Sequence, residues 1–428
     1  MDFAEHLKSY LNQDEIDQLL ESLNDDAKHA VLLNERKMSD DRFLSLFPHV
    51  TPHPIVPHAY IYDKNEYQLG KSIYQTLGCY YLQEPSAMIP SYLLSPKDND
   101  TVLDLCAAPG GKSVQASFLM HNKGVIISND ISHSRAMAIL ENVERLGLGN
   151  LVITNNDFAK IYKNYLSYFD KIIVDAPCSG SGMFRKEEKM LSDWSYNKVL
   201  KYQQEQKQLV LIAYQMLKPG GTMVYSTCSF SEEEDEDVIT HLLFNTDAQL
   251  SPINHSPLFY KNKKQPIGVH LLPSIFPGEG HYICLIKKPG ILKENKEENG
   301  PTKNNQNKNI DCLCTYVEKY GNTLFGFQKA FKNKGLSIIR TGVKIGELIH
   351  NDIKYDYHYS HFVDTFSPAF SLNFTELEQY FTGNIIRTSC PKGNVLLQYE
   401  NINVDITKCD ISVIKNHLPK SLRGKIQK

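Results

Sequence analysis

Five short apolar runs that alternate with helical patterns constrain the fold of this chain more than any other feature. The runs occupy residues 101–105, 124–128, 151–154, 171–174 and 221–225. Short continuous apolar strands separated by helices pair in parallel, and the helices cover both faces of the sheet. The pattern therefore predicts a doubly wound α/β domain, in which ligands bind just beyond the carboxyl ends of the strands.

A turn of small residues follows the first run directly. It consists of Cys106, Ala107, Ala108, Pro109, Gly110, Gly111 and Lys112. Adjacent glycines allow the backbone to approach a ligand closely just before a helix begins. Their spacing fits neither the Gly-x-Gly-x-x-Gly fingerprint of dinucleotide-binding proteins nor the P-loop. We therefore expect a ligand site of another type at this turn.

Acidic residues follow the next three runs. Asp130 follows the second run, where a carboxylate can accept hydrogen bonds from both hydroxyl groups of a ribose. Asp157 follows the third run, from which a carboxylate can accept from an exocyclic adenine amine, and Asp175 follows the fourth. Each acid alone could equally be a helix cap or a turn residue. Together with the glycine turn, the three acids predict a cofactor site.

Two cysteines follow the fourth and fifth runs. Cys178 stands in Asp-Ala-Pro-Cys-Ser-Gly-Ser-Gly (175–182), and Cys228 stands in Ser-Thr-Cys-Ser (226–229). A loop at the carboxyl edge of a sheet is not a core position, so we expect both thiols to be functional. A thiolate can add to carbon 6 of cytosine and thereby make carbon 5 nucleophilic, which splits one difficult reaction into two easier steps.

An acidic block at residues 232–237 comes shortly after the second cysteine. Negative charge at this place does not favour a thiolate. Ser231 and Glu234 have the spacing of a capping box, and acids in a first helical turn complement the helix dipole. We therefore predict that Ser231 caps a helix that starts with this block.

At these residues the sequence resembles the Sun (NSUN) family of RNA cytosine-5 methyltransferases. The resemblance rests on residues 106–112, 175–182, 226–229 and 81–88 (Tyr-Leu-Gln-Glu-Pro-Ser-Ala-Met). It implies a Rossmann-like, S-adenosylmethionine-dependent methyltransferase domain that acts on RNA. The family pattern assigns the turn from Cys106 to Lys112, with Asp130, Asp157 and Asp175, to the cofactor site. It also assigns nucleophilic attack to Cys228 and assistance in product release to Cys178. We hypothesise further that Asp175 holds the cytosine by its ring nitrogen and that Lys112 orients the site.

The C-terminal ending resembles that of the bacterial family members that modify 16S ribosomal RNA. Residues 415–423 read Lys-Asn-His-Leu-Pro-Lys-Ser-Leu-Arg. The resemblance implies an N-terminal RNA-binding segment and a C-terminal PUA-like domain that contacts RNA. One departure is visible near the N-terminus, because Leu32 and Leu33 precede Asn34 where the family usually has an Arg two residues before the Asn. The RNA contact of that Arg is therefore not carried over.

The remaining patterns suggest how the chain is divided. Apolar residues from Phe3 to Leu23 recur at helical spacing, and residues 287–308 have the polar composition of a linker. The predicted parts are an α+β RNA-binding segment (1–70), the methyltransferase domain (71–288), a linker (289–308), an intermediate domain (309–375) and a PUA-like RNA-binding domain (376–428).

Composition limits the partners and the compartment. The net charge is −3, but residues 415–428 form a basic ending without an acid, which suits RNA phosphates. The chain has no signal-peptide pattern and no apolar run long enough to span a membrane. Its nine cysteines are scattered, and the close pair Cys312 and Cys314 lacks a second pair for zinc. We expect a monomeric bacterial protein of the cytoplasm that binds 16S ribosomal RNA or the small ribosomal subunit, without a metal or a membrane.

Three alternatives remain open. Methylation of transfer RNA or another structured RNA would use the same site. A DNA cytosine-5 methyltransferase would use Cys178 as its nucleophile, but Ser-Thr-Cys after the fifth run is evidence against it. A non-catalytic RNA-binding or ribosome-assembly module would need neither the cysteines nor the acids.

Overall fold

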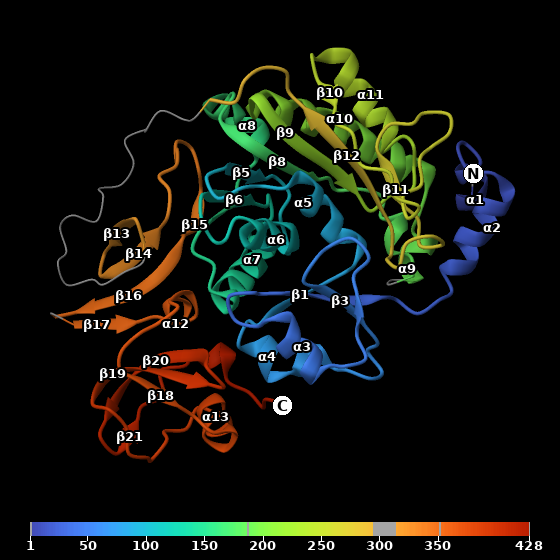
Figure 1. The fold of residues 1–428 in the computed structure, drawn as a ribbon. Helices are drawn as coiled ribbons and strands as arrows, with labels where there is room; N and C mark the ends of the chain where they lie inside the picture. Colours follow the sequence, from blue (N-terminus) through green and yellow to red (C-terminus); the bar gives the residue numbers. More distant parts are fainter. Residues whose placement is uncertain (1, 186–187, 294–313, 351, 428) are drawn as a thin grey trace.

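A large central sheet carries the predicted α/β domain (Figure 1). The structure is a computed structural model that describes residues 2–185, 188–293, 314–350 and 352–427. All of the predicted runs form strands, and they are mutually parallel in the order β9-β8-β5-β6-β7. Their bounds are β5 (Thr101–Asp104), β6 (Val125–Asn129), β7 (Leu151–Thr154), β8 (Phe169–Asp175) and β9 (Leu217–Thr227).

Helices cover both faces of this sheet because alternate residues of each strand point to opposite sides. Val102 and Ile126 belong to one core, and their neighbours Leu103 and Ile127 belong to the other. The first face is covered by α5 (Ile89–Leu94), α6 (Gly111–Leu119) and α7 (His133–Leu146). The second face is covered by α8 (Phe158–Ile161), η3 (Tyr162–Tyr165), α10 (Tyr196–Met216) and α11 (Glu236–Asn245).

Antiparallel strands extend the sheet at both edges. On one side β12 (His281–Lys287) pairs with β9, and β10 (Gln249–Leu250) and β11 (Val269–Leu271) pair with β12. On the other side β15 (Ile338–Thr341) pairs with β7. Because β15 lies in the predicted intermediate domain, that segment contributes directly to the central sheet.

The N-terminal segment is divided between two places. The predicted helices are present as α1 (Phe3–Leu7) and α2 (Gln13–Ser22), and they pack against Phe184 and Phe230 of the predicted methyltransferase domain. A separate sheet of order β2-β3-β1-β4 follows, covered by short helices. These elements are β1 (His29–Leu33), α3 (Asp40–Leu46), β2 (Thr51–Pro52), β3 (Ala59–Tyr62), η1 (Leu69–Lys71), α4 (Ile73–Thr76) and β4 (Tyr80–Gln83).

The C-terminal part forms two small sheets with a helix beside each. The first has the order β13-β14-β16-β17 and the second β18-β19-β20-β21. The elements are β13 (Tyr316–Tyr320), β14 (Thr323–Phe327), β16 (Val343–Ile349), β17 (Asp352–Tyr355), α12 (Tyr357–Phe362), β18 (Ala369–Ser371), α13 (Phe374–Phe381), β19 (Gly393–Tyr399), β20 (Ile402–Asp410), β21 (Val413–Ile414) and η5 (Lys420–Leu422). The predicted boundary at 375/376 falls within α13.

The two ends of the chain share one hydrophobic core. Phe43 and Tyr74 of the N-terminal sheet region lie in the same buried cluster as Tyr380 and Phe381 of α13. The backbone nitrogen of Ile73 also donates to the carbonyl oxygen of Gln427, at 2.6 Å. Figure 1 shows the C-terminus beside the blue N-terminal sheet region. The second C-terminal sheet is therefore held against the N-terminal sheet.

Candidate active site

The two predicted cysteines meet at the carboxyl edge of the central sheet. Asp175 at the end of β8 is in register with Ser226 near the end of β9, so the loops that follow lie side by side. The Sγ atoms of Cys178 and Cys228 are 3.1 Å apart, and both residues are half-buried. The amide of Gly182 donates to the carbonyl oxygen of Cys228, at 2.7 Å, which joins the loops through the backbone.

The surroundings of the Cys178 thiol disfavour its thiolate form. The neighbouring Cys228 and burial both raise the pKa of the Cys178 thiol well above its ordinary value. A negative charge on one sulfur opposes a second charge on the other. The raised pKa therefore keeps the Cys178 thiol protonated at neutral pH.

A second group of charged side chains lies at the same edge. Lys112, at the start of α6, has its Nζ 2.7 Å from an Asp175 oxygen, and its side chain is 9% exposed. Nε2 of His281 in β12 lies 3.7 Å from the other Asp175 oxygen. Burial alone raises the pKa of the Asp175 carboxyl, but Lys112 and His281 outweigh it and hold that pKa well below its usual range. Asp175 is therefore a carboxylate throughout the neutral pH range.

The predicted cofactor turn lies between these groups and the end of β6. Gly110 has φ 110°, a conformation that favours glycine, and a Cβ on Gly111 would lie 2.9 Å from Nε2 of Gln83. The amide of Ala107 donates to the carbonyl oxygen of Asn129 at 2.7 Å, which places the turn next to Asp130. Glycine therefore suits position 110 through its backbone conformation and position 111 through the close approach of Gln83.

The two other acids differ in how they are held. Asp130 is 2% exposed, and its Oδ1 accepts from the amide of Ser132 at 2.8 Å. Its Oδ2 lies 3.5 Å from exposed Arg135, so this oxygen retains capacity to accept from a ligand hydroxyl. Asp157 caps α8 by accepting from the amide of Ala159 at 3.1 Å. Asp157 therefore fulfils the helix-cap role.

Sequence reasoning missed three buried side chains near the site. Asp104 accepts from the Ser113 hydroxyl at 2.6 Å, and burial raises the pKa of this carboxyl to about 7. His281 comes from an antiparallel strand distant in sequence. Glu234 is the third, and the prediction made for it is wrong.

The capping box at Ser231 and Glu234 does not form. Helix α11 begins at Glu236, with Asp235 at the N-cap position. The carboxylate of Glu234 turns back toward the cysteine loops and accepts hydrogen bonds from Ser179 and Ser229. The Ser-x-x-Glu spacing was satisfied, but tertiary hydrogen bonds replaced the local ones because Glu234 is fully buried.

Leu32, at which the sequence departs from the family pattern, is buried in the core that the N-terminal sheet shares with the first face of the central sheet. Nδ2 of buried Asn34 donates to the carbonyl oxygens of Gly78 and Leu146, at 3.0 and 3.1 Å. Asn34 therefore joins the N-terminal sheet region to the end of α7. Of the close cysteine pair, Cys314 is buried, and Cys312 lies outside the described residues.

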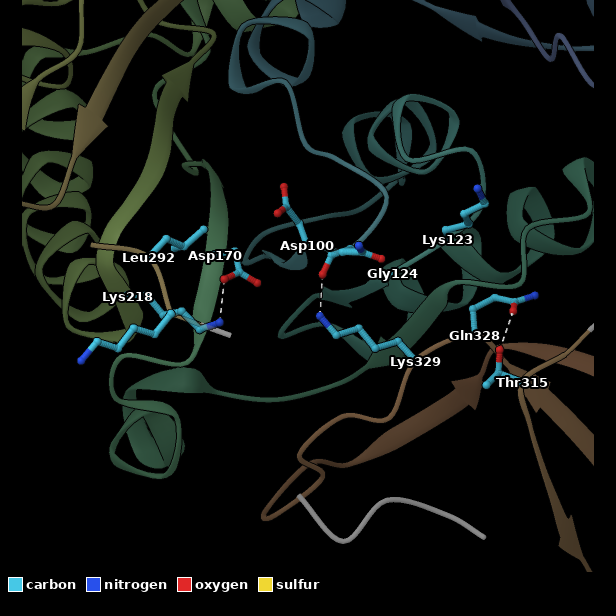
Figure 2. A pocket seen from close by; sticks show the side chains of 11 residues that line it. Asp100, Lys123, Gly124, Asp170, Lys218, Leu292, Thr315, Gln328 and Lys329 are labelled. Atoms are coloured by element: carbon cyan, nitrogen blue, oxygen red, sulfur yellow. Dashed lines mark hydrogen bonds and ion pairs between the residues drawn. The ribbon is translucent and has the colours of Figure 1, made fainter. Parts of the chain in front are cut away.

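A cavity of about 730 Å³ lies at the opposite edge of the sheet (Figure 2). Its lining includes Asp100 and Gly124, which precede β5 and β6, and Lys218 and Asp170, which form an ion pair of 2.6 Å near the starts of β9 and β8. Ligands of doubly wound sheets bind at the carboxyl ends of the strands. This cavity is therefore separate from the cysteine site.

Comparisons with known proteins cover almost the whole chain. A model of the 16S rRNA methyltransferase RsmB/F matches residues 91–287. Models of the N-terminal domain of 16S rRNA methyltransferase RsmF and of the RsmF PUA domain match residues 1–85 and 367–424. Among the described residues, no helix is both long and apolar enough to cross a membrane.

Relatives and solved structures agree with these matches. Ribosomal RNA small subunit methyltransferase F of Shewanella piezotolerans is 30% identical, over 92% of this chain and 90% of the relative. The protein of that name from Vibrio vulnificus is 29% identical, over 92% and 91%. A methyltransferase homologue from Pyrococcus horikoshii is 28% identical with TM-score 0.60, over 67% of this chain and 94% of the other. NSun6 from Pyrococcus horikoshii with SFG shares the fold at 19% identity and TM-score 0.61, over 67% and 98%. The predicted methyltransferase fold and PUA domain are confirmed.

Proposed function

The chain belongs to the RsmB/F family of 16S rRNA methyltransferases, and from that premise we propose that it methylates carbon 5 of a cytosine in 16S rRNA through a covalent bond to Cys228. Family membership makes it an rRNA methyltransferase that uses S-adenosylmethionine. The position of the methyl group and the covalent step are our proposal. The observation that carries it is the 3.1 Å separation of two thiols beside an ionised carboxylate.

Cys228 is assigned the attack. Its thiolate forms a bond to carbon 6 of the cytosine, and the electrons of the 5,6 double bond make carbon 5 nucleophilic. The ring nitrogen takes up a proton from water as carbon 6 is attacked and returns it to water when the double bond is restored. Asp175, ionised beside Lys112, accepts a hydrogen bond from this protonated nitrogen and so stabilises the charge that develops there. This role needs a carboxylate that does not take up the proton, and the low pKa of Asp175 meets that need.

Cys178 is assigned to product release. Once the sulfur of Cys228 is bonded to the ring, it no longer offers Cys178 the thiol hydrogen bond and the charge that raise the Cys178 pKa. Cys178 then loses its proton to water and accepts the proton from carbon 5. The electrons of that carbon–hydrogen bond restore the double bond and expel Cys228 as a thiolate. The enzyme returns to its starting protonation state.

The residues around the glycine turn fit S-adenosylmethionine. When bound, this cofactor supplies the electrophilic methyl group. The turn from Cys106 to Lys112 offers close backbone approach, Asp130 offers a buried acceptor for the ribose hydroxyls, and Asp157 offers an acceptor for the adenine amine. Asp175 completes the set at the end of β8.

We also propose the surroundings in which the enzyme works. The PUA domain and the basic ending bind RNA, with 16S rRNA or the small ribosomal subunit as partner. The protein acts as a monomer in the bacterial cytoplasm. The names of its relatives support the ribosomal RNA partner.

Transfer of labelled methyl groups tests the proposal. The protein is incubated with S-adenosylmethionine carrying a labelled methyl group and with 16S rRNA, assembled small subunits or transfer RNA in parallel. Digestion to nucleosides should place the label in 5-methylcytidine from 16S rRNA. Label in transfer RNA alone would favour that substrate, and label in another nucleoside would overturn the cytosine chemistry. No transfer to any RNA would favour a non-catalytic RNA-binding module.

A further inference from the structure

One buried carboxylate contacts the loops of both cysteines. Oε1 of Glu234 accepts from the backbone amide of Ser179 at 2.8 Å, and Oε2 accepts from the Ser179 hydroxyl. The same Oε2 accepts from the hydroxyl of Ser229 at 2.7 Å. Because Ser179 and Ser229 directly follow Cys178 and Cys228, each thiol is one residue away from the shared carboxylate.

The third attachment comes from helix α10. Nε2 of Gln206 donates to Oε1 of Glu234 at 3.1 Å and to the carbonyl oxygen of Pro177 at 2.8 Å. Gln206 is fully buried, so water does not compete for these bonds. The loop of Cys178 is therefore fixed both before and after the cysteine.

The carboxylate is itself held in place. Glu234 is fully buried, and the hydroxyl of Tyr225 on β9 donates to its carbonyl oxygen at 2.7 Å. Its amide donates to the carbonyl oxygen of Ser231 at 2.9 Å. A side chain with a fixed backbone and hydrogen bonds to both loops can set the distance between them.

We propose that Glu234 is a positioning residue that holds Cys178 and Cys228 at the separation their reaction requires. It is fully buried and acts through Ser179, Ser229 and Gln206. The catalytic meaning of this role rests on the proposed function, whereas the geometric role does not. Glu234 is thus a part of the methylation machinery outside the reacting groups.

The geometric role predicts an order among substitutions. Glu234→Gln keeps the side-chain length, and its carbonyl oxygen still accepts from Ser179 and Gln206 while the serine hydroxyls turn to accept. Glu234→Asp keeps the charge but shortens the side chain by one methylene, so it cannot reach both loops. Glu234→Ala removes the contacts entirely. If Glu234 acts by positioning, Glu234→Gln should preserve the distance between the two cysteines better than Glu234→Asp does. If its charge is what matters, Glu234→Asp should preserve that distance better.

Disulfide formation between the two cysteines measures this geometry without RNA or cofactor. Diamide takes two electrons and two protons from the thiols, which become a disulfide while its nitrogen–nitrogen double bond becomes a hydrazine. Peptide mapping over time gives the rate for the Cys178–Cys228 pair separately from other cysteines. The native protein should form this disulfide fast, and Glu234→Gln should form it at a rate within about threefold of the native rate. Glu234→Ala and Glu234→Asp should form it about tenfold or more slowly, because the two thiols are no longer held close together.

A matched control uses the neighbouring buried carboxylate. Glu236 is also fully buried, but its oxygen pairs with Nε2 of His270 at 2.8 Å rather than with the cysteine loops. Glu236→Gln should cross-link at the native rate. Thermal unfolding of each variant establishes that the compared proteins are folded under the assay conditions. If Glu234→Ala does not fold, the order of the Gln and Asp variants decides the question.

Methylation assays on the same variants separate the two proposals. A positioning role lowers kcat in Glu234→Ala and Glu234→Asp while KM for RNA stays unchanged, since Glu234 is fully buried and offers RNA no surface. The variants could cross-link at rates in the predicted order while the native enzyme makes no 5-methylcytidine. That outcome would support the positioning role and overturn the proposed function. Folded Glu234→Ala or Glu234→Asp that cross-links at the native rate would overturn positioning.

Discussion

The Sγ atom of Cys178 lies 3.1 Å from the Sγ atom of Cys228, although the residues are 50 positions apart in the chain. Parallel pairing of β8 with β9 brings them together, since both loops leave the same edge of the sheet. Two thiols at this distance cannot both be charged at neutral pH without strong repulsion. The geometry therefore suits a cycle in which the thiols act one after the other.

The ribose assignment predicts a loss of cofactor affinity in Asp130→Ala. Removing a hydrogen bond to a charged group costs about 1.5–3 kcal/mol, which corresponds to roughly tenfold to hundredfold weaker binding. Isothermal titration calorimetry with S-adenosylmethionine measures it. Cofactor affinity equal to that of the native protein would refute the assignment.

Asp157→Ser separates the two roles of that residue. Serine is as good an N-cap as aspartate, so α8 should keep its cap and the unfolding temperature should not change. The hydroxyl is a poorer acceptor for the adenine amine than the carboxylate, so cofactor binding should weaken. If stability and affinity both match the native protein, Asp157 is only a helix cap.

The buried His358 predicts a loss of stability in acid. Burial, and next Arg340, lower the pKa of His358 to about 3, against 6.5 in the unfolded chain. Between these values the unfolded state binds one more proton, so the free energy of unfolding falls as pH decreases from about 6.5 toward 3.

The comparison uses His358→Gln. Urea unfolding at pH 5.5 and 4.5 gives the free energy of unfolding of each protein. Between these two pH values it should change less in His358→Gln than in the native protein, by about 1.4 kcal/mol per pH unit. Equal slopes in the two proteins would mean that His358 is protonated in the fold.

The basic ending predicts a change in the salt dependence of RNA binding. Lys415, Lys420 and Lys425 are exposed, so replacing them with alanine avoids the core that α13 shares with the N-terminal sheet region. The triple variant should bind 16S rRNA more weakly. The slope of the logarithm of its binding constant against the logarithm of the salt concentration should be shallower by about 0.7–0.9 for each phosphate that is no longer neutralised.

Filter binding at several salt concentrations gives both quantities. The corresponding triple arginine variant keeps the charges and should retain the native slope. An alanine variant with native affinity and native slope would show that the ending is only a solvated surface.

The central sheet could be predicted because its strands are buried on both faces. Such strands appear in sequence as unbroken apolar runs, and the residues that follow them, such as Asp130 and Cys228, lie at one edge as a geometric consequence. The side chains that gather at this edge could therefore be predicted from the order of the strands in the chain.

The contacts of Glu234 and His281 could not be predicted in this way. Ser231 and Glu234 fit a local capping pattern, but Glu234 bonds to Ser179, which is 55 residues away. His281 reaches Asp175 because β12 adds antiparallel to β9, and no local pattern marks that pairing. Long-range packing decided both outcomes.

The covalent trap gives the most direct test of the central claim. Cys178→Ala and Cys228→Ala proteins are incubated with RNA and S-adenosylmethionine and run on denaturing gels. Cys228→Ala should give neither methylation nor a protein–RNA band, because no thiolate adds to carbon 6. Cys178→Ala should permit attack and methyl transfer but slow elimination, so a slow-migrating band of protein bonded to methylated RNA accumulates. A trapped band with Cys228→Ala and none with Cys178→Ala would reverse the roles and contradict the account.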